Sequence, residues 1–176
     1  LVYAGFISYG FEIIQDVVTL LHHNNVNFRL YIISSSNCEI LDESVVHIRT
    51  PLYENQEILQ KCHVGLIPRK GDPYIDATFP LKVMDYLTYH LPIVACDNVE
   101  LETFVRDRGV GFTVPYDPES FCSAIMTFIK RPDLWNEMHR RAFDVIQSRD
   151  SWDHRAESVV ELIDELRNQK TRVKTK

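Results

Sequence analysis

The predicted fold follows from the stretch Asp76-Ala77-Thr78-Phe79-Pro80-Leu81-Lys82-Val83-Met84-Asp85-Tyr86-Leu87, with Leu91-Pro92-Ile93-Val94-Ala95 close behind it. A polar turn leads through Pro80 into a helix, and a short β-branched strand follows. Open parallel α/β sheets bind ligands at such places, and the free N–H groups of a helix start favour an anion. We therefore expect a ligand-binding turn here, inside an alternating α/β fold.

The helix of this stretch has two different faces. Its apolar stripe, which we expect to pack, holds Leu81, Met84, Leu87 and Leu91. A second stripe, which we expect to be exposed, holds Lys82, Asp85 and Tyr89. Lys82 and Asp85 form either an ordinary surface ion pair or, because both lie in the first two turns, part of a charged ligand site.

Strands and helices alternate on both sides of this stretch. Before it, apolar runs predict strands at residues 2–5, 28–33, 45–48 and 64–68, with helices at 11–21 and 54–62. After it come a strand at 92–95, a helix at 100–107, a strand at 109–114, and helices at 118–130, 132–148 and 151–169. This pattern predicts an α/β protein, a Rossmann-like parallel sheet of about six strands with flanking helices, closed by C-terminal helices.

Size and charge limit the possible functions. The chain has 176 residues, 45% of them hydrophobic, so we expect one globular domain at 1–169 and a basic, disordered tail at 170–176. Its formal charge of −6 argues against nucleic acid or a membrane surface as a partner, although one phosphorylated ligand can still be held locally.

Cysteines and histidines indicate neither a disulfide framework nor a metal site. The four cysteines are scattered and the seven histidines show no ligand spacing, so we expect reduced thiols, a reducing compartment and no bound metal. No apolar run is long enough to span a membrane. Because the chain starts inside a strand and without Met, we expect it to be a piece of a longer protein.

Several common site motifs are missing. Only Gly5 and Gly10 follow the first strand, which is too few for a dinucleotide fingerprint, and neither a P-loop nor a GxSxG elbow is present. Two other polar clusters follow predicted strands. Arg69-Lys70-Gly71-Asp72 is either a plain loop or a ligand contact, and Asp97-Asn98 either caps the next helix or approaches the same crevice.

Seven short motifs carry a resemblance to a known family. They are Tyr3-Ala4-Gly5, Thr78-Phe79-Pro80, Asp85-Tyr86, His90-Leu91-Pro92-Ile93-Val94-Ala95, Gly109-Val110-Gly111-Phe112-Thr113-Val114, Asp117-Pro118-Glu119 and Ser151-Trp152. In their order and spacing the chain resembles the donor-binding, C-terminal half of the group 1 (family 4) retaining glycosyltransferases. The resemblance implies one half of a GT-B fold, a nucleotide-diphosphate sugar as substrate, and no metal or other cofactor.

The resemblance also implies roles for individual residues. The donor would lie across the helix start at Pro80, whose N–H groups stabilise the departing diphosphate. Asp85 stands at the second carboxylate of the family's E-x7-E motif, which binds the ribose hydroxyls. The first carboxylate position is Ala77, so its neighbour Asp76 is the candidate for the sugar contact. The donor-binding set is Gly5, Arg69, Thr78, Phe79, Pro80, Leu81, Lys82 and Asp85.

Two cations that the family usually carries after the first strand are absent. Phe6 and the segment Tyr9-Gly10 stand in their places. We predict that Lys82 replaces one of them and that Arg69 or Lys70 supplies the other. Lys82 and Asp76 are the candidate catalytic residues.

The resemblance predicts the donor half of an enzyme that transfers a sugar from a nucleotide-sugar to an acceptor hydroxyl, with retention and without a metal. A missing N-terminal domain of the same protein would bind the acceptor, so the chain alone would transfer no sugar. The missing cations leave open a degenerate nucleotide-sugar-binding or assembly module without transferase activity. A sugar-nucleotide epimerase of the same fold is a third hypothesis, which would need more carboxylates and histidines in the cleft.

Two further expectations concern location and the last helix. We expect a cytoplasmic protein, with contact to the cytoplasmic membrane face only through the missing half. Without that half, we expect the apolar stripe of the last helix to be partly exposed; it holds Trp152, Ala156, Val159, Val160 and Ile163.

Overall fold

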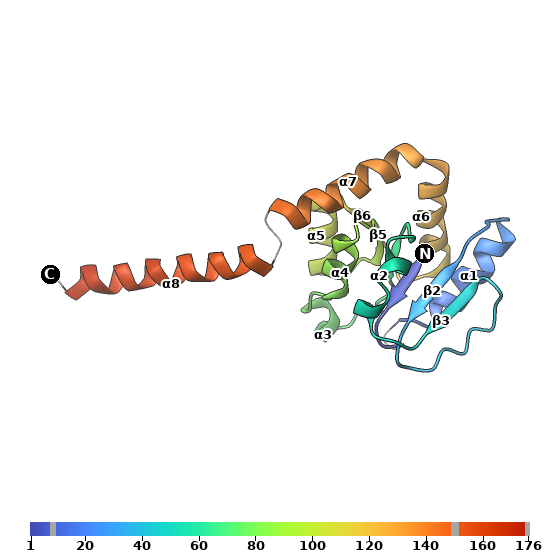
Figure 1. Ribbon diagram of the computed structural model, residues 1–176, viewed down its shortest axis with the longest axis horizontal. Coiled ribbons are helices and arrows are strands. Elements are labelled where there is room, and N and C mark those ends of the chain that lie inside the picture. The colour runs from blue at the N-terminus through green and yellow to red at the C-terminus, as the bar shows by residue number, and fades with distance from the viewer. Residues whose placement is uncertain (8–9, 149–151, 175–176) are drawn as a thin grey trace.

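The computed structural model describes residues 1–7, 10–148 and 152–174, and Figure 1 shows a sheet flanked by helices. The strands are β1 (Val2–Ala4), β2 (Leu30–Ile33), β3 (Val45–Ile48), β4 (Gly65–Ile67), β5 (Ile93–Cys96) and β6 (Gly111–Val114). They form one six-stranded sheet in the order β3-β2-β1-β4-β5-β6, with every neighbouring pair parallel. The direction of the strand order reverses between β1 and β4. The predicted Rossmann-like α/β fold is confirmed.

The helices follow the predicted alternation, with different bounds near the site. They are α1 (Ile13–His23), the 3-10 turn η1 (Leu52–Glu54), α2 (Gln56–Leu59), α3 (Pro73–Asp76), α4 (Lys82–Thr88), α5 (Val99–Arg108), α6 (Pro118–Lys130), α7 (Pro132–Ser148) and α8 (Trp152–Lys174). Helix α3 was not predicted. It forms because the Asp72 carboxylate accepts from the N–H groups of Tyr74 and Ile75, both at 2.8 Å, and Pro73 occupies the first helical position.

Helices α6 and α7 have the predicted bounds, for a local reason. Asp117 accepts a hydrogen bond from the Ser120 N–H at 2.7 Å, and Pro118 begins the helix. Pro132 then starts α7 directly after α6 has ended.

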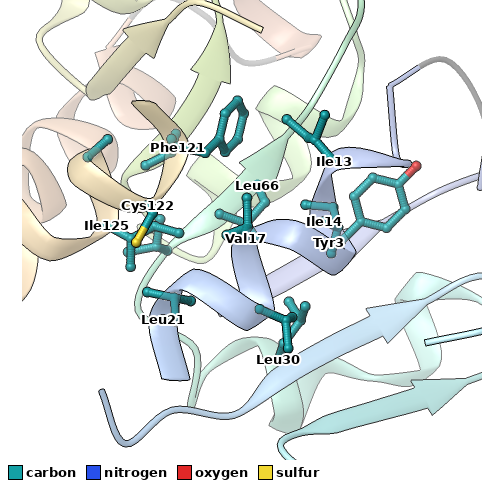
Figure 2. Packing of buried hydrophobic residues seen from close by; sticks show 14 of the residues in the cluster. Tyr3, Ile13, Ile14, Val17, Leu21, Leu30, Leu66, Phe121, Cys122 and Ile125 are labelled. Carbon is teal, nitrogen blue, oxygen red and sulfur yellow. The ribbon is translucent and has the colours of Figure 1, made fainter. Parts of the chain in front are cut away.

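Each face of the sheet has its own apolar core. Helices α1 and α6 pack over one face, where Figure 2 shows their side chains meeting above the strands. Helices α2, α4, α5 and α7 cover the other face. Residues of β1 alternate between the two cores, so that Tyr3 faces the first while Val2 and Ala4 face the second. Because both faces are covered, the inner strands β1, β4 and β5 are apolar and fully buried, which made them easy to find in the sequence.

The packing face of α4 was predicted only in part. Leu87 and Leu91 are buried as predicted, whereas Leu81 is 63% exposed, and Val83 and Tyr86 are also fully buried. Apolar residues occur on two overlapping stripes of this short helix, and only the sheet decides between them. The Tyr86 ring fits because Gly65 has no side chain, since a Cβ there would lie 2.6 Å from the ring Cγ.

The remaining predictions concern the thiols and the C-terminal end. All four cysteines are free, and three of them are buried. Helix α8 extends from the body in Figure 1 and continues to Lys174, beyond the predicted end near Gln169, while residues 175–176 of the predicted tail lie outside the described residues. Val159 and Val160 are each 57% exposed, as expected for its apolar stripe. Among the helices of the described residues, none combines the length and apolar character of a membrane span.

Candidate functional site

The candidate site lies at the carboxyl ends of β1 and β4, where the strand order reverses. In open α/β sheets this is the position at which ligands bind, because the connections on the two sides lead away from each other. The two strands pair at Val2 and Gly65. Further along, the Tyr86 hydroxyl accepts from the Ala4 N–H at 2.8 Å and donates to the Leu66 carbonyl at 3.3 Å. Helix α4 is therefore attached to both strands at the mouth of the crevice.

Lys82, at the start of α4, reaches over the end of β1. Its Nζ lies 4.4 Å from the centroid of the Tyr3 ring, and a Cβ at residue 5 would come within 3.1 Å of that nitrogen. Gly5 has a φ of 119°, a conformation that L side chains rarely adopt, so the space beside the ammonium stays open. Lys82 is thus half-buried, which corrects the prediction that it lies on an exposed stripe.

The surroundings of Lys82 alter its protonation. The pKa of Lys82 is lowered from 10.5 to about 8, first by burial and then by the positive charge of Arg69, while Asp85 opposes both. At neutral pH the amine is still mostly protonated, but its positive charge is only weakly balanced by other groups of the protein. An anion placed beside it would meet a cation that is only partly solvated.

Asp85 lies one turn after Lys82 and is solvent-exposed. Partial burial of its carboxyl group raises its pKa, and the nearby Lys82 limits this shift. Lys82, Asp85 and Gly5 line one wall of a cavity of about 410 Å³. The opposite wall consists of the ends of β2 and β3, with Ser34, Ser35 and the segment 49–52.

Arg49 brings a further cation to this cavity, and sequence reasoning missed it. Its Nη2 donates to the Asn37 side-chain oxygen, and its residue lies directly after β3. The signal was available, because a charged residue just beyond the carboxyl end of a parallel strand lies at the ligand-binding edge of the sheet.

Arg69 joins the loop after β4 to the turn before α4. Its Nη2 donates to the Thr78 hydroxyl at 2.8 Å and its Nη1 to the Thr78 carbonyl at 3.3 Å. The Thr78 hydroxyl in turn donates to the Ile75 carbonyl at 3.0 Å. Burial lowers the pKa of Arg69. The predicted site residue Arg69 is near enough to Lys82 for its positive charge to lower the pKa of that lysine, while its own hydrogen bonds hold the turn in place.

The other predicted residues lie around the turn, outside the lining of this cavity. Phe79 packs edge-on against Phe104, with ring centroids 5.0 Å apart, Pro80 is buried and Leu81 is exposed. These residues anchor the turn rather than meet in one pocket. Within the described residues, no cluster of three or more His, Cys, Asp and Glu side chains has the arrangement to hold a metal ion.

Asp76 belongs to a separate polar cluster. Its carboxylate accepts from the Asn98 Nδ2 at 3.0 Å, and its neighbour Ala77 is exposed at the end of α3. Asn98 does occupy the N-cap position of α5, but its side chain makes no capping bond there. The capping prediction was right about the position and wrong about the bond. The side-chain nitrogen of Asn98 donates to Asp76, and its Oδ1, the atom that would accept a capping bond, is buried without a hydrogen-bond partner among the described residues.

Comparisons with known proteins concern the family and the fold of this chain. A family profile described as glycosyl transferases group 1 matches residues 1–131. Sucrose-phosphate synthase from Thermosynechococcus elongatus has a similar structure, with a TM-score of 0.76, 14% identity, and 96% of this chain and 46% of that chain covered. WaaG, a glycosyltransferase involved in lipopolysaccharide biosynthesis, gives a TM-score of 0.68 at 11% identity, covering 89% of this chain and 45% of that chain.

A third solved structure is UDP-GlcNAc 2-epimerase from Neisseria meningitidis bound to UDP-GlcNAc, with a TM-score of 0.56, 13% identity, and 84% and 43% of the two chains covered. This chain therefore spans less than half the length of the structures that it matches. No curated protein sequence matches it. At these identities the structural similarities show the fold alone, and that fold is the predicted half of a GT-B architecture.

Proposed function

Since this chain belongs to the group 1 family of glycosyl transferases, we propose that it is the donor-binding half of a retaining, metal-independent enzyme that transfers a sugar from a nucleotide-sugar to an acceptor hydroxyl. One observation carries the proposal. The Lys82 ammonium lies beside Gly5 at the open end of β1, facing a cavity that Asp85 also lines. A cation and a carboxylate at this edge of the sheet suit the diphosphate and the ribose of one nucleotide.

Lys82 and Arg69 supply the charge that such a reaction needs. As the bond between sugar and diphosphate breaks, negative charge grows on the leaving diphosphate, so a nearby cation stabilises the transition state more than the bound donor. Lys82 at the cavity, with Arg69 outside its lining but near enough to lower the pKa of Lys82, would supply this positive charge without a metal ion. Binding of the diphosphate would also raise the pKa of Lys82 again, because an opposite charge favours the ammonium form.

Asp85 and the far wall of the cavity suit the rest of the nucleotide. A carboxylate can accept hydrogen bonds from two neighbouring ribose hydroxyls. The cavity of about 410 Å³ is within the usual size range of small-molecule sites. Arg49 and the hydroxyls of Ser34 and Ser35 then offer polar contacts at the opposite end. Asp76, which does not line this cavity, remains the candidate for the contact with the donor sugar.

The acceptor site belongs to a part of the enzyme that this chain does not contain. The chain covers 46% of the sucrose-phosphate synthase structure, which supports a missing acceptor domain. The UDP-GlcNAc bound to the epimerase of similar fold supports a nucleotide-sugar as the partner. We accordingly expect no sugar transfer by the chain alone. A cytoplasmic location is a separate part of the proposal. Turnover by the isolated chain would contradict the first expectation.

A degenerate binding or assembly module is the second candidate function. It is favoured by Phe6, which is 74% exposed where the family usually carries an arginine, and by Arg69, whose guanidinium already bonds to Thr78. A thermal-shift screen of UDP-, GDP- and ADP-sugars separates the two candidates, because a ligand that binds only the folded state raises its melting temperature. No shift with any donor would favour the degenerate module.

The proposed role of Lys82 is tested by calorimetric titration with the nucleoside diphosphate that binds best. Lys82→Ala should weaken binding by more than about tenfold, because it removes the cation beside the diphosphate. Lys61→Ala, which alters an exposed lysine that does not line this cavity, is the control and should leave the affinity unchanged. Equal affinities of the Lys82 variant and the unmodified chain would refute the role.

A further inference from the structure

The hydrogen bonds between β1 and β4 change partner halfway along the strands. The Val2 N–H donates to the Val64 carbonyl at 2.9 Å. Two residues further along both strands, the same parallel ladder would join the Ala4 N–H to the Leu66 carbonyl. Both groups bond to the Tyr86 hydroxyl instead, at 2.8 Å and 3.3 Å. This side-chain hydroxyl therefore takes the place of one bond of the sheet.

This hydroxyl bridge holds β1 and β4 apart at the point where the strand order reverses. Tyr86 is fully buried, and its ring lies against Gly65 on the β4 side. In a continuous ladder the Ala4 N–H and the Leu66 carbonyl would meet directly, whereas here an oxygen atom stands between them. The separation occurs immediately before Gly5, where the open end of β1 meets the cavity.

The same helix turn connects this bridge to Lys82. Lys82 and Tyr86 are four residues apart on α4, so their side chains leave the same face of the helix. Both contact β1, since Tyr86 bonds to Ala4 while the Lys82 Nζ lies over the Tyr3 ring at 4.4 Å. The hydrogen bond from Ala4 to the Tyr86 hydroxyl therefore fixes the distance between α4 and β1 beside Lys82.

We propose that Tyr86 is a positioning residue of the candidate site, whose hydroxyl bridges β1 and β4 and thereby holds the Lys82 ammonium at the open end of β1. The nature of the anion that Lys82 receives rests on the proposed function. The positioning role does not, because it concerns the protein without ligand. Tyr86 does not line the cavity, so it acts on a ligand only through the residues that it positions, which are Ala4 and Lys82.

Tyr86→Phe removes the bridging oxygen and leaves the ring in place. Two NMR measurements on the chain without ligand follow the result. Hydrogen exchange of the Ala4 amide should become about tenfold faster or more, because its acceptor is gone. The pKa of Lys82, followed through its 13Cε shift and assigned by loss of the signal in Lys82→Arg, should rise from about 8 toward 10.5 as the ammonium gains water.

Two further variants distinguish positioning from a general loss of stability. Val18→Ala removes buried volume from α1 on the other face of the sheet. It should leave the Lys82 pKa unchanged and speed the exchange of core amides in common, without the selective effect on Ala4. Gly65→Ala pushes the Tyr86 ring from the β4 side and should change the Lys82 pKa and the Ala4 exchange in the same direction as Tyr86→Phe. If Gly65→Ala does not fold, the comparison of Tyr86→Phe with Val18→Ala still decides the question.

A folded Tyr86→Phe variant with an unchanged Lys82 pKa and a protected Ala4 amide would overturn the proposal. Affinity for UDP, GDP or ADP is measured in parallel, and should fall at least about threefold in Tyr86→Phe and remain unchanged in Val18→Ala. If none of the three binds the unmodified chain, the proposed function fails, while the exchange and pKa measurements still test the positioning role of Tyr86.

Discussion

Replacing Lys82 with methionine should make the protein more stable while it weakens nucleotide binding. Methionine keeps the length of the apolar stem but has no charge, and Lys82 is held as a cation in a partly buried place. Functional groups kept in unfavourable surroundings commonly cost stability, so the two effects are expected to have opposite signs.

The magnitude follows from the shifted pKa. The pKa of Lys82 is lowered from 10.5 to about 8, mainly by burial, so the unfolded chain binds more protons between these two values. The free energy of unfolding therefore rises with pH across this window, and below pH 8 the cost of the charged lysine is present in full. It amounts to about 3 kcal/mol at most. Loss of the contact with the Tyr3 ring offsets about 1 kcal/mol of the gain. A net stabilisation of about 2 kcal/mol, or roughly 6 °C in melting temperature, remains at pH 7.

Denaturant unfolding at pH about 7 and pH about 10 checks this reasoning. The gain of Lys82→Met over the unmodified chain should be largest at the lower pH and shrink at the higher one, because the unmodified chain loses its penalty as the amine deprotonates. Lys61→Met, at an exposed lysine, is the control and should change neither value. A Lys82→Met protein that is less stable at neutral pH, or a gain that does not depend on pH, would refute the argument.

Three further predictions concern stability. Gly111→Ala should lower the free energy of unfolding by about 3 kcal/mol, because a Cβ would collide with the Ile93 backbone, 2.8 Å from its nitrogen. Thermal unfolding measures this loss, and a variant of near-normal stability would contradict it. Asp117→Ala should cost about 1 kcal/mol by removing the N-cap of α6, while Asp117→Asn should retain most of the stability. Burial and, after it, the charge of His139 lower the pKa of His90. The stability that depends on a neutral His90 is therefore complete above pH about 6.5 and is lost as the pH falls below that value. In denaturant unfolding at acidic pH, His90→Asn, which tolerates the φ of 58°, should lose less stability than the unmodified chain, and an identical loss would count against the assignment.

The fold was largely predictable because its signals are local. Strands buried on both faces are apolar runs, and a proline at the first helical position with an aspartate before it marks a helix start. Both signals depend on a few neighbouring residues, so the bounds of α6 and α7 were predicted correctly. Near the site, α4 begins at Lys82 rather than at the predicted start Pro80, and α3 was not predicted although Asp72-Pro73 carries the same signal.

The candidate site, like the fold, was predictable from the sequence only in part. The sequence alone determined that Lys82 and Asp85 lie on one short helix at the carboxyl edge of a parallel sheet, because spacing on a helix and strand order fix that much. Only the tertiary structure decided that Lys82 lies against Gly5, that Arg49 faces the same cavity, and that the Tyr86 hydroxyl replaces a bond of the sheet. These contacts join residues up to 82 positions apart, and they depend on how α4 settles between two strands. Hydrophobic periodicity cannot predict these contacts, since the space left by Gly65 in β4 selects which side chains of α4 are buried.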